Sequence, residues 1–192
     1  MKPGAGGQGP GARVLLLAVL AAMCSCVQPA PLEDMGPAPS FQLTAEDGRP
    51  FDSKSLAGHV WVADFVYTTC TGPCPMMSSQ MRQIQNSTAA EMADIKLVSF
   101  TVDPAHDTPA VLAAYAKHFT PDFDRWSFLT GEQSKLNDVG LGFKLNGVDG
   151  STTHSTRFVL VDRRGRIRGF YVTSDDAFMP RLMHDLRQLE KQ

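Results

Sequence analysis

Two cysteines, Cys70 and Cys74, are separated by three residues and follow a run of apolar residues. The run from Val60 to Val66 is rich in β-branched and aromatic side chains, which predicts a buried strand. Pro75, after the second cysteine, suits the first turn of a helix. A helix N-terminus stabilises thiolates. Two neighbouring thiolates can either close a disulfide or bind a soft metal ion together.

Three kinds of chemistry are open to this cysteine pair. In a thiol–disulfide oxidoreductase the first thiolate attacks a disulfide and the second cysteine resolves the mixed disulfide. In a peroxidase a single cysteine is oxidised to sulfenic acid, but Tyr67 stands where such a site would need a threonine. In a metal carrier both thiolates bind the ion at once. Thr71, Gly72 and Pro73 widen the loop between the cysteines and leave room for an ion, although a disulfide can still close.

His154 favours the metal carrier. It lies in a polar stretch directly before a predicted strand, and we expect this loop to face the two cysteines across the end of the sheet. Two cysteines and one histidine form a soft site that suits Cu(I) and tolerates Cu(II), whereas zinc normally takes a fourth ligand. The alternative is an ordinary loop histidine. We expect structural or solvated roles for the other histidines, namely His59, His106, His118 and His184.

The remaining pattern predicts a single α/β domain. Strands are expected at residues 40–44, 50–51, 60–67, 95–102, 127–130, 156–162 and 166–172, and helices beginning near Pro75, Thr108, Glu132 and Asp175. A strand, a cysteine pair, a helix and a closing hairpin with a helix form the thioredoxin-like arrangement, here with an extra N-terminal β-hairpin. We expect Met76 and Met77 to belong to the core.

The N-terminal residues are typical of an export signal. Lys2 and Arg13 precede an apolar run that is too short to span a bilayer, and Cys24 and Cys26 follow it. This pattern favours a lipid anchor on Cys24 or Cys26, with plain cleavage and an uncleaved anchor as alternatives. We therefore divide the chain into a signal peptide or lipoprotein-type anchor at 1–26, a Pro-rich linker at 27–40 and the domain at 41–190, placed outside the cytoplasm.

The charge balance gives no reason to expect a nucleic-acid partner. The chain has 18 basic and 20 acidic residues, with a formal net charge of −2. The one basic cluster, residues 163–168, surrounds a predicted hairpin turn. We expect it to be a solvated face, with a docking patch for an acidic partner as the alternative.

Three segments, in this order along the chain, resemble the Sco/SenC family. They are Trp61–Pro75 with the cysteine pair, Val102–Pro109 with its Val-Asp-Pro and Asp-Thr-Pro motifs, and His154–Thr156. The similarity extends from about Phe41 to Leu189. Many members of the family have aspartate immediately before the ligand histidine, where this chain has Thr153, a difference that bears on copper affinity.

The resemblance implies a thioredoxin-like, membrane-anchored copper-binding protein on the periplasmic side of the membrane. Its metal ligands would be Cys70, Cys74 and His154, and it would deliver copper to the binuclear copper centre of cytochrome c oxidase. Expected partners are the oxidase subunit that holds this centre, other copper carriers and thioredoxin-like reductants. The resemblance favours a metallochaperone over an enzyme. The alternative is a thiol–disulfide oxidoreductase that keeps the cysteines of an oxidase subunit reduced through a redox-active Cys70–Cys74 disulfide.

Overall fold

The computed structural model describes residues 1, 2, 4, 30–145 and 155–192. The chain divides into two units, Met1–Pro31 and Leu32–Gln192, and the described helices and strands all belong to the second. Three of the predicted functional residues, Cys24, Cys26 and His154, lie outside the described residues. Within the described ranges, no helix combines the length and the apolar character needed to cross a bilayer.

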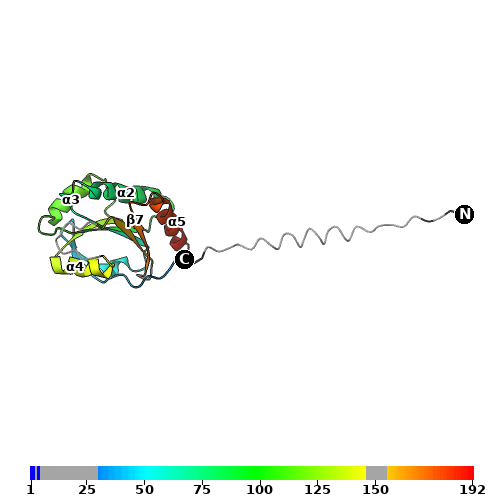
Figure 1. The fold of residues 1–192 in the computed structure, drawn as a ribbon, viewed down its shortest axis with the longest axis horizontal. Helices are drawn as coiled ribbons and strands as arrows, with labels where there is room; N and C mark the ends of the chain where they lie inside the picture. The colour runs from blue at the N-terminus through cyan, green and yellow to red at the C-terminus, as the bar shows by residue number, and fades with distance from the viewer. Residues whose placement is uncertain (3, 5–29, 146–154) are drawn as a thin grey trace. The chain divides into compact units, whose positions relative to one another are not determined.

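The second unit is an α/β domain whose described part contains seven strands and four α-helices (Figure 1). The strands are β1 (Gln42–Ala45), β2 (Pro50–Asp52), β3 (Trp61–Val66), β4 (Lys96–Thr101), β5 (Trp126–Thr130), β6 (Arg157–Val161) and β7 (Ile167–Val172). The helices are α2 (Pro73–Thr88), α3 (Pro109–Lys117), α4 (Gln133–Gly142) and α5 (Phe178–Glu190), with a short 3-10 turn, η2 (Ser53–Leu56). The predicted order of elements is confirmed.

All seven strands form one sheet in the order β2-β1-β5-β4-β3-β6-β7. The β3–β4 and β4–β5 pairs are parallel, and the other neighbouring pairs are antiparallel. Every residue of β3 is buried, as the run of apolar residues without alternation predicts for a central strand. The predicted thioredoxin-like fold with an added N-terminal hairpin, β1–β2, is therefore confirmed.

Helices cover both faces of the sheet. Figure 1 shows α2, α3 and α5 on one side and α4 on the other. The first layer packs through residues such as Met81, Leu112 and Leu186, and the second through Leu136 and Val139. Because both faces are covered, the ends of the strands are the parts of the sheet at which polar loops gather.

The structure corrects several predicted details. Met77 is buried, but Met76 is 49% exposed. The buried face of α2 contains Met77, Met81 and Ile84, and Met76 lies outside this face. The last helix begins at Phe178 and not near Asp175, because the Asp175 carboxylate accepts a hydrogen bond from the N–H of Ala177 in a turn ahead of the helix.

Residues 32–39 lie along the outer edge of β7, although the sequence predicts a linker over 27–40. The N–H of Met35 donates to the carbonyl of Ile167 at 2.9 Å, and the N–H of Ile167 donates to the carbonyl of Gly36 at 2.8 Å. Prolines do not prevent this pairing, because the residues between them still provide N–H groups at a sheet edge. Three apolar side chains of the segment also pack on the core, namely Leu32, Met35 and Ala38.

Most arginines around the β6–β7 turn form ion pairs with carboxylates. The predicted basic face is therefore partly neutralised by acidic partners and not only by solvent. Arg163 contacts Asp94 and Glu190, and the other two pairs are Arg166–Asp34 and Arg168–Asp162. These pairs reduce the net positive charge of the hairpin turn.

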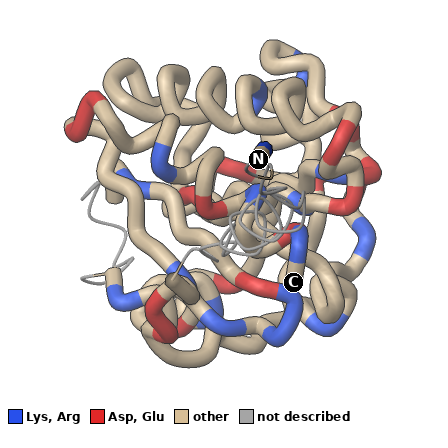
Figure 2. Tube along the Cα trace, turned by 90° about the vertical axis from the view of Figure 1, so that its right-hand side faces the viewer, with Lys and Arg blue, Asp and Glu red and all other residues tan. Residues whose placement is uncertain are grey.

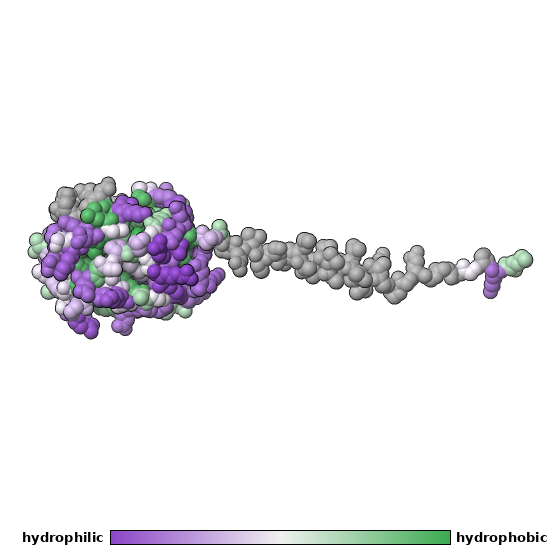
Figure 3. Space-filling view, turned by 90° about the horizontal axis from the view of Figure 1, so that it is seen from below, coloured by the Kyte–Doolittle hydropathy of each residue, from purple (hydrophilic) through white to green (hydrophobic). Residues whose placement is uncertain are grey.

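Figure 2 shows positive and negative residues interspersed along the domain. The face in Figure 3 is mostly hydrophilic, with apolar side chains in scattered patches.

The edge segment yields a prediction about stability. A chain that lacks residues 1–39 should have a lower free energy of unfolding than a chain that lacks residues 1–31, by about 3 kcal/mol. The shorter chain loses the partly buried apolar side chains and the backbone hydrogen bonds of residues 32–39. Urea unfolding of the two chains measures the difference, and equal midpoints and slopes would show that the segment contributes nothing.

Candidate metal centre

The cysteine pair lies where the central strand β3 passes into helix α2. Gly72 is the N-cap of α2 and Pro73 its first residue, so Cys74 sits in the first turn and Cys70 two residues before the cap. The 16-residue helix directs the positive end of its dipole toward both sulfurs. The two cysteines are not joined by a disulfide, and they are buried, with 6% and 1% of their surface exposed. We call Cys70 and Cys74 the dithiol.

The two thiols differ in acidity. Burial alone would raise the pKa of Cys70, but hydrogen bonds from the Cys74 thiol, from the backbone of Cys74 and Gly72, and from Tyr67 lower it below its ordinary value. Burial, together with the hydrogen bond to Cys70, raises the pKa of Cys74 to about 12. Cys70 is therefore the more acidic of the two thiols, and Cys74 keeps its proton near neutral pH.

Tyr67 packs against the dithiol and contributes a donor to it. Desolvation raises the pKa of the Tyr67 phenol, and its hydrogen bond to Cys70 and the nearby charges of the dithiol and Asp103 raise it further. The phenol therefore stays protonated and donates to the Cys70 sulfur. Asp103, in the loop after β4, is close enough for its charge to affect the pKa of Tyr67 and so lies near the site.

Asp64 is a carboxyl group in the middle of β3, with 0% of its surface exposed. Among the described residues, neither of its oxygens has a hydrogen-bond partner of good geometry. Burial raises the pKa of Asp64 to about 7, and the neighbouring Ser99 hydroxyl offsets this only in part. Its charge would also oppose ionisation of Cys74. Asp64 is thus a carboxyl group that the core favours in the neutral form.

The histidines are placed as follows. The predicted ligand His154 lies outside the described residues, so its approach to the dithiol stays a prediction. His59 contacts Asp94 at the start of β3, His118 is the C-cap of α3 and His184 lies on α5. His106 lies near the dithiol loop, with its Nδ1 3.3 Å from the Thr68 hydroxyl. Within the described ranges, no three His, Cys, Asp or Glu side chains are close enough to hold a metal ion.

Sequence analysis did not identify Asp64, Tyr67 or Asp107 as parts of the site. A charged residue inside an otherwise apolar run was a usable signal for Asp64. Thr108, the predicted start of a helix, is the N-cap of α3, and the carboxylate of the preceding Asp107 accepts hydrogen bonds from Thr68 and Thr101. These contacts join residues distant in sequence, and no local pattern reveals them.

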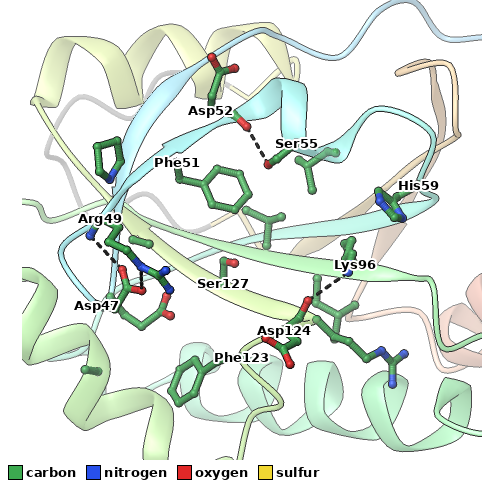
Figure 4. A pocket seen from close by; sticks show the side chains of 18 of the residues that line it. Asp47, Arg49, Phe51, Asp52, Ser55, His59, Lys96, Phe123, Asp124 and Ser127 are labelled. Carbon is green, nitrogen blue, oxygen red and sulfur yellow. Dashed lines mark hydrogen bonds and ion pairs between the residues drawn. The ribbon is translucent and has the colours of Figure 1, made fainter.

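A separate cleft of about 820 Å³ lies at the other end of the sheet (Figure 4). Phe51 and Phe123 lie on opposite sides of it, and Ser127 lies between them. Its lining includes His59 and Lys96, at the beginnings of β3 and β4, whereas the dithiol follows the end of β3. The cleft contains basic and acidic side chains and no cysteine. The thiol chemistry therefore places the candidate site at the dithiol and not in this cleft.

The raised pKa of Asp64 leads to a prediction about pH. In the folded chain Asp64 binds its proton up to about pH 7, whereas in the unfolded chain it loses it near pH 4, so its contribution to stability falls as pH rises between these values. The variant Asp64→Asn cannot titrate. Its stability relative to wild type should rise by roughly 4 kcal/mol between about pH 4 and pH 8.

Urea unfolding of both proteins across this pH range provides the measurement, and the contributions of all other titrating groups cancel in the difference. A difference that does not change with pH would show that Asp64 titrates normally.

Comparison with known proteins identifies relatives over nearly the whole second unit. Residues 31–189 match the model of the SCO1/SenC family. The SCO1 protein homolog of Bacillus subtilis is 37% identical over 134 residues, covering 66% of this chain and 69% of the relative. A Stutzerimonas stutzeri protein whose name describes copper binding is 31% identical over 139 residues, covering 68% of this chain and 67% of the relative.

Two solved structures are similar as well. A SCO1/SenC family lipoprotein of Bacillus anthracis superimposes with a TM-score of 0.74 at 32% identity, covering 83% of this chain and 99% of that chain. BsSco, described as a member of the Sco family of cytochrome c oxidase assembly proteins with a disulfide switch, has a TM-score of 0.73 at 30% identity, covering 83% and 97%. The chain therefore belongs to the SCO1/SenC family.

Proposed function

We propose that this chain is a membrane-anchored, extracytoplasmic copper-binding protein that supplies copper to the binuclear copper centre of cytochrome c oxidase. Cys70, Cys74 and His154 would be the copper ligands. A relative named for copper binding and a solved relative described as an oxidase assembly protein support this proposal. Copper is here the cargo of the protein.

The observation that carries the proposal is the dithiol itself. Cys70 and Cys74 are not joined by a disulfide, and they meet at the N-terminus of α2 in a chain whose family assignment covers residues 31–189. Thiolates are the ligands that Cu(I) prefers. A hydrogen bond between the two side chains shows that the sulfurs are within mutual reach.

Copper transfer from such a site needs no change of oxidation state. A thiolate of the acceptor binds the Cu(I) ion while the bonds from Cys70 and Cys74 to copper break one after the other. The protons that leave the acceptor thiols balance those that return to Cys70 and Cys74. The raised pKa of Cys74 favours its return to the thiol form and therefore favours release of copper to the acceptor.

Replacement of one sulfur tests the proposal directly. The variant Cys70→Ser, purified under reducing and anaerobic conditions, should lose stoichiometric Cu(I) loading. One thiolate and one imidazole bind Cu(I) more weakly than a site that contains two thiolates. Competition with a chromophoric Cu(I) chelator measures the affinity. Full copper loading in this variant would contradict the assignment.

The third ligand needs its own test. His154→Ala should weaken Cu(I) binding by more than about 100-fold, whereas the control His184→Ala, an exposed histidine on α5, should bind as wild type does. Equal affinity of the two variants would remove His154 from the ligand set and leave a site with two sulfurs.

A thiol–disulfide oxidoreductase is the second candidate, and the unequal acidity of the thiols favours it. The Cys70 thiolate would attack a disulfide of a partner and form a mixed disulfide. Cys74 would then displace the second sulfur, so that the partner gains two electrons and the Cys70–Cys74 pair becomes a disulfide. His154→Ala separates the candidates, since a reductase should keep most of its exchange rate while a copper carrier loses affinity.

We further propose that a lipid on Cys26 or Cys24 anchors the domain, a proposal supported by the solved lipoprotein relative. Metabolic labelling with a fatty acid should mark the wild-type chain, and one of the variants Cys24→Ser and Cys26→Ser should abolish the label. Labelling that persists in the double variant would exclude a lipid on either cysteine.

A further inference from the structure

Asp107 lies in the loop between β4 and α3, and its side chain is buried, with 0% of its surface exposed. Its carboxylate accepts hydrogen bonds from two strand ends. The Thr101 hydroxyl, on the last residue of β4, donates to Oδ2 at 2.5 Å. The Thr68 hydroxyl, two residues beyond the end of β3, donates to Oδ1 at 2.5 Å, and the Thr68 N–H donates to Oδ2 at 3.2 Å.

Further contacts fix the carboxylate in this position. The N–H of Asp107 donates to the carbonyl of Asp103 at 2.8 Å, and the N–H of Asp103 donates to the Thr101 hydroxyl at 3.0 Å. The ring nitrogen Nδ1 of His106 lies 3.1 Å from Oδ1. Asp107 also precedes the N-cap of α3, where the helix dipole stabilises a negative charge. The carboxylate is thus saturated with donors and cannot shift without breaking several bonds.

Thr68 links this network to the dithiol. The sulfur ligand Cys70 is two residues farther along the chain, and its N–H donates to the carbonyl of Tyr67 at 3.3 Å. The N–H and the hydroxyl of Thr68 both donate hydrogen bonds to the Asp107 carboxylate. The backbone that leads from β3 to Cys70 is therefore tied to the α3 side of the domain through one buried carboxylate.

We propose that Asp107 is a positioning residue for the dithiol. Its carboxylate fixes the exit of β3 and thereby holds Cys70 where it can share a metal ion with Cys74. Asp107 does not touch the sulfurs in this arrangement and acts through Thr68. The inference rests on the proposed function for the identity of the ion, Cu(I), but the clamp between Asp107 and Thr68 can be tested without metal.

The test uses the full chain and the variant Asp107→Asn, which keeps the size of the side chain but replaces one acceptor oxygen by a donor. We expect Cu(I) affinity to fall by about 10- to 100-fold, the usual effect of removing a group that orients a metal ligand. In the metal-free, reduced protein we also expect hydrogen exchange in residues 67–72 to become at least about tenfold faster, because loss of the clamp opens this loop. Should Asp107→Asn fail to fold, Thr68→Val, which removes the hydroxyl alone, gives the same two readouts.

Two matched variants separate positioning from general stability. Thr68→Ser keeps both donors to Asp107 and should bind Cu(I) as wild type does. Arg125 directly precedes β5 and belongs to a different buried network, in which its guanidinium donates to the Thr88 hydroxyl and the Gln85 carbonyl. The variant Arg125→Lys disturbs this network. It should lower the free energy of unfolding and leave the affinity and the exchange of residues 67–72 within about threefold of wild type.

Each outcome decides the proposal. Faster exchange together with weaker Cu(I) binding supports it. Unchanged exchange, or faster exchange with unchanged affinity, overturns it, and so does an equal loss of affinity in Arg125→Lys. If the wild-type chain binds no Cu(I) through its cysteines, the proposed function fails, and the exchange measurement alone then decides whether Asp107 positions the dithiol loop.

Discussion

The parallel pairing of β3 with β4 is the constraint on which the candidate site depends. Because the two strands run in the same direction, both leave the sheet at the same end, and their pairing continues to the bond from the N–H of Val102 to the carbonyl of Val66. The dithiol follows one strand and the loop with Asp103 and Asp107 follows the other. Thr68 and Asp107, which are 39 residues apart in sequence, thereby come within hydrogen-bonding distance of each other.

The same constraint explains why the end of the sheet is rich in polar groups while its centre is apolar. Helices on both faces exclude water from β3, and a polar side chain inside the strand is therefore not solvated. Asp64 is such a side chain. Beyond the strand the chain can provide partners, and there Asp107 accepts hydrogen bonds from three donors on two threonines. Two buried carboxyl groups of one small domain therefore differ in their surroundings. Among the described residues, Asp64 has only the Ser99 hydroxyl to offset its burial and favours its neutral form, whereas the Asp107 carboxylate accepts hydrogen bonds from Thr68 and Thr101.

Much of this fold could be predicted from the sequence because its signals are local. The apolar run of β3, the proline in the first turn of α2 and the Thr-Pro start of α3 each act over a few residues, and all three are present in the structure. Residues 32–39 were missed because proline content describes local stiffness, whereas their place is set by the free edge of β7. Met76 was misplaced because its burial depends on the rotation of the whole helix about its axis. The clamp at Asp107 was missed for a similar reason, since its partners are set by strand pairing.

The electrostatics of the dithiol indicate why a monovalent ion suits it. Without metal, Cys70 is the more acidic of the two thiols, while Cys74 keeps its proton. Under the proposed function, Cu(I) bound to both sulfurs would take the place of the Cys74 proton, so that positive charge would arrive as positive charge leaves. The nearby Asp64, whose pKa burial raises to about 7, opposes a negative charge on Cys74, and a bound cation would offset that charge. Such an exchange of protons for Cu(I) would lower the electrostatic cost of both binding and release at the proposed site.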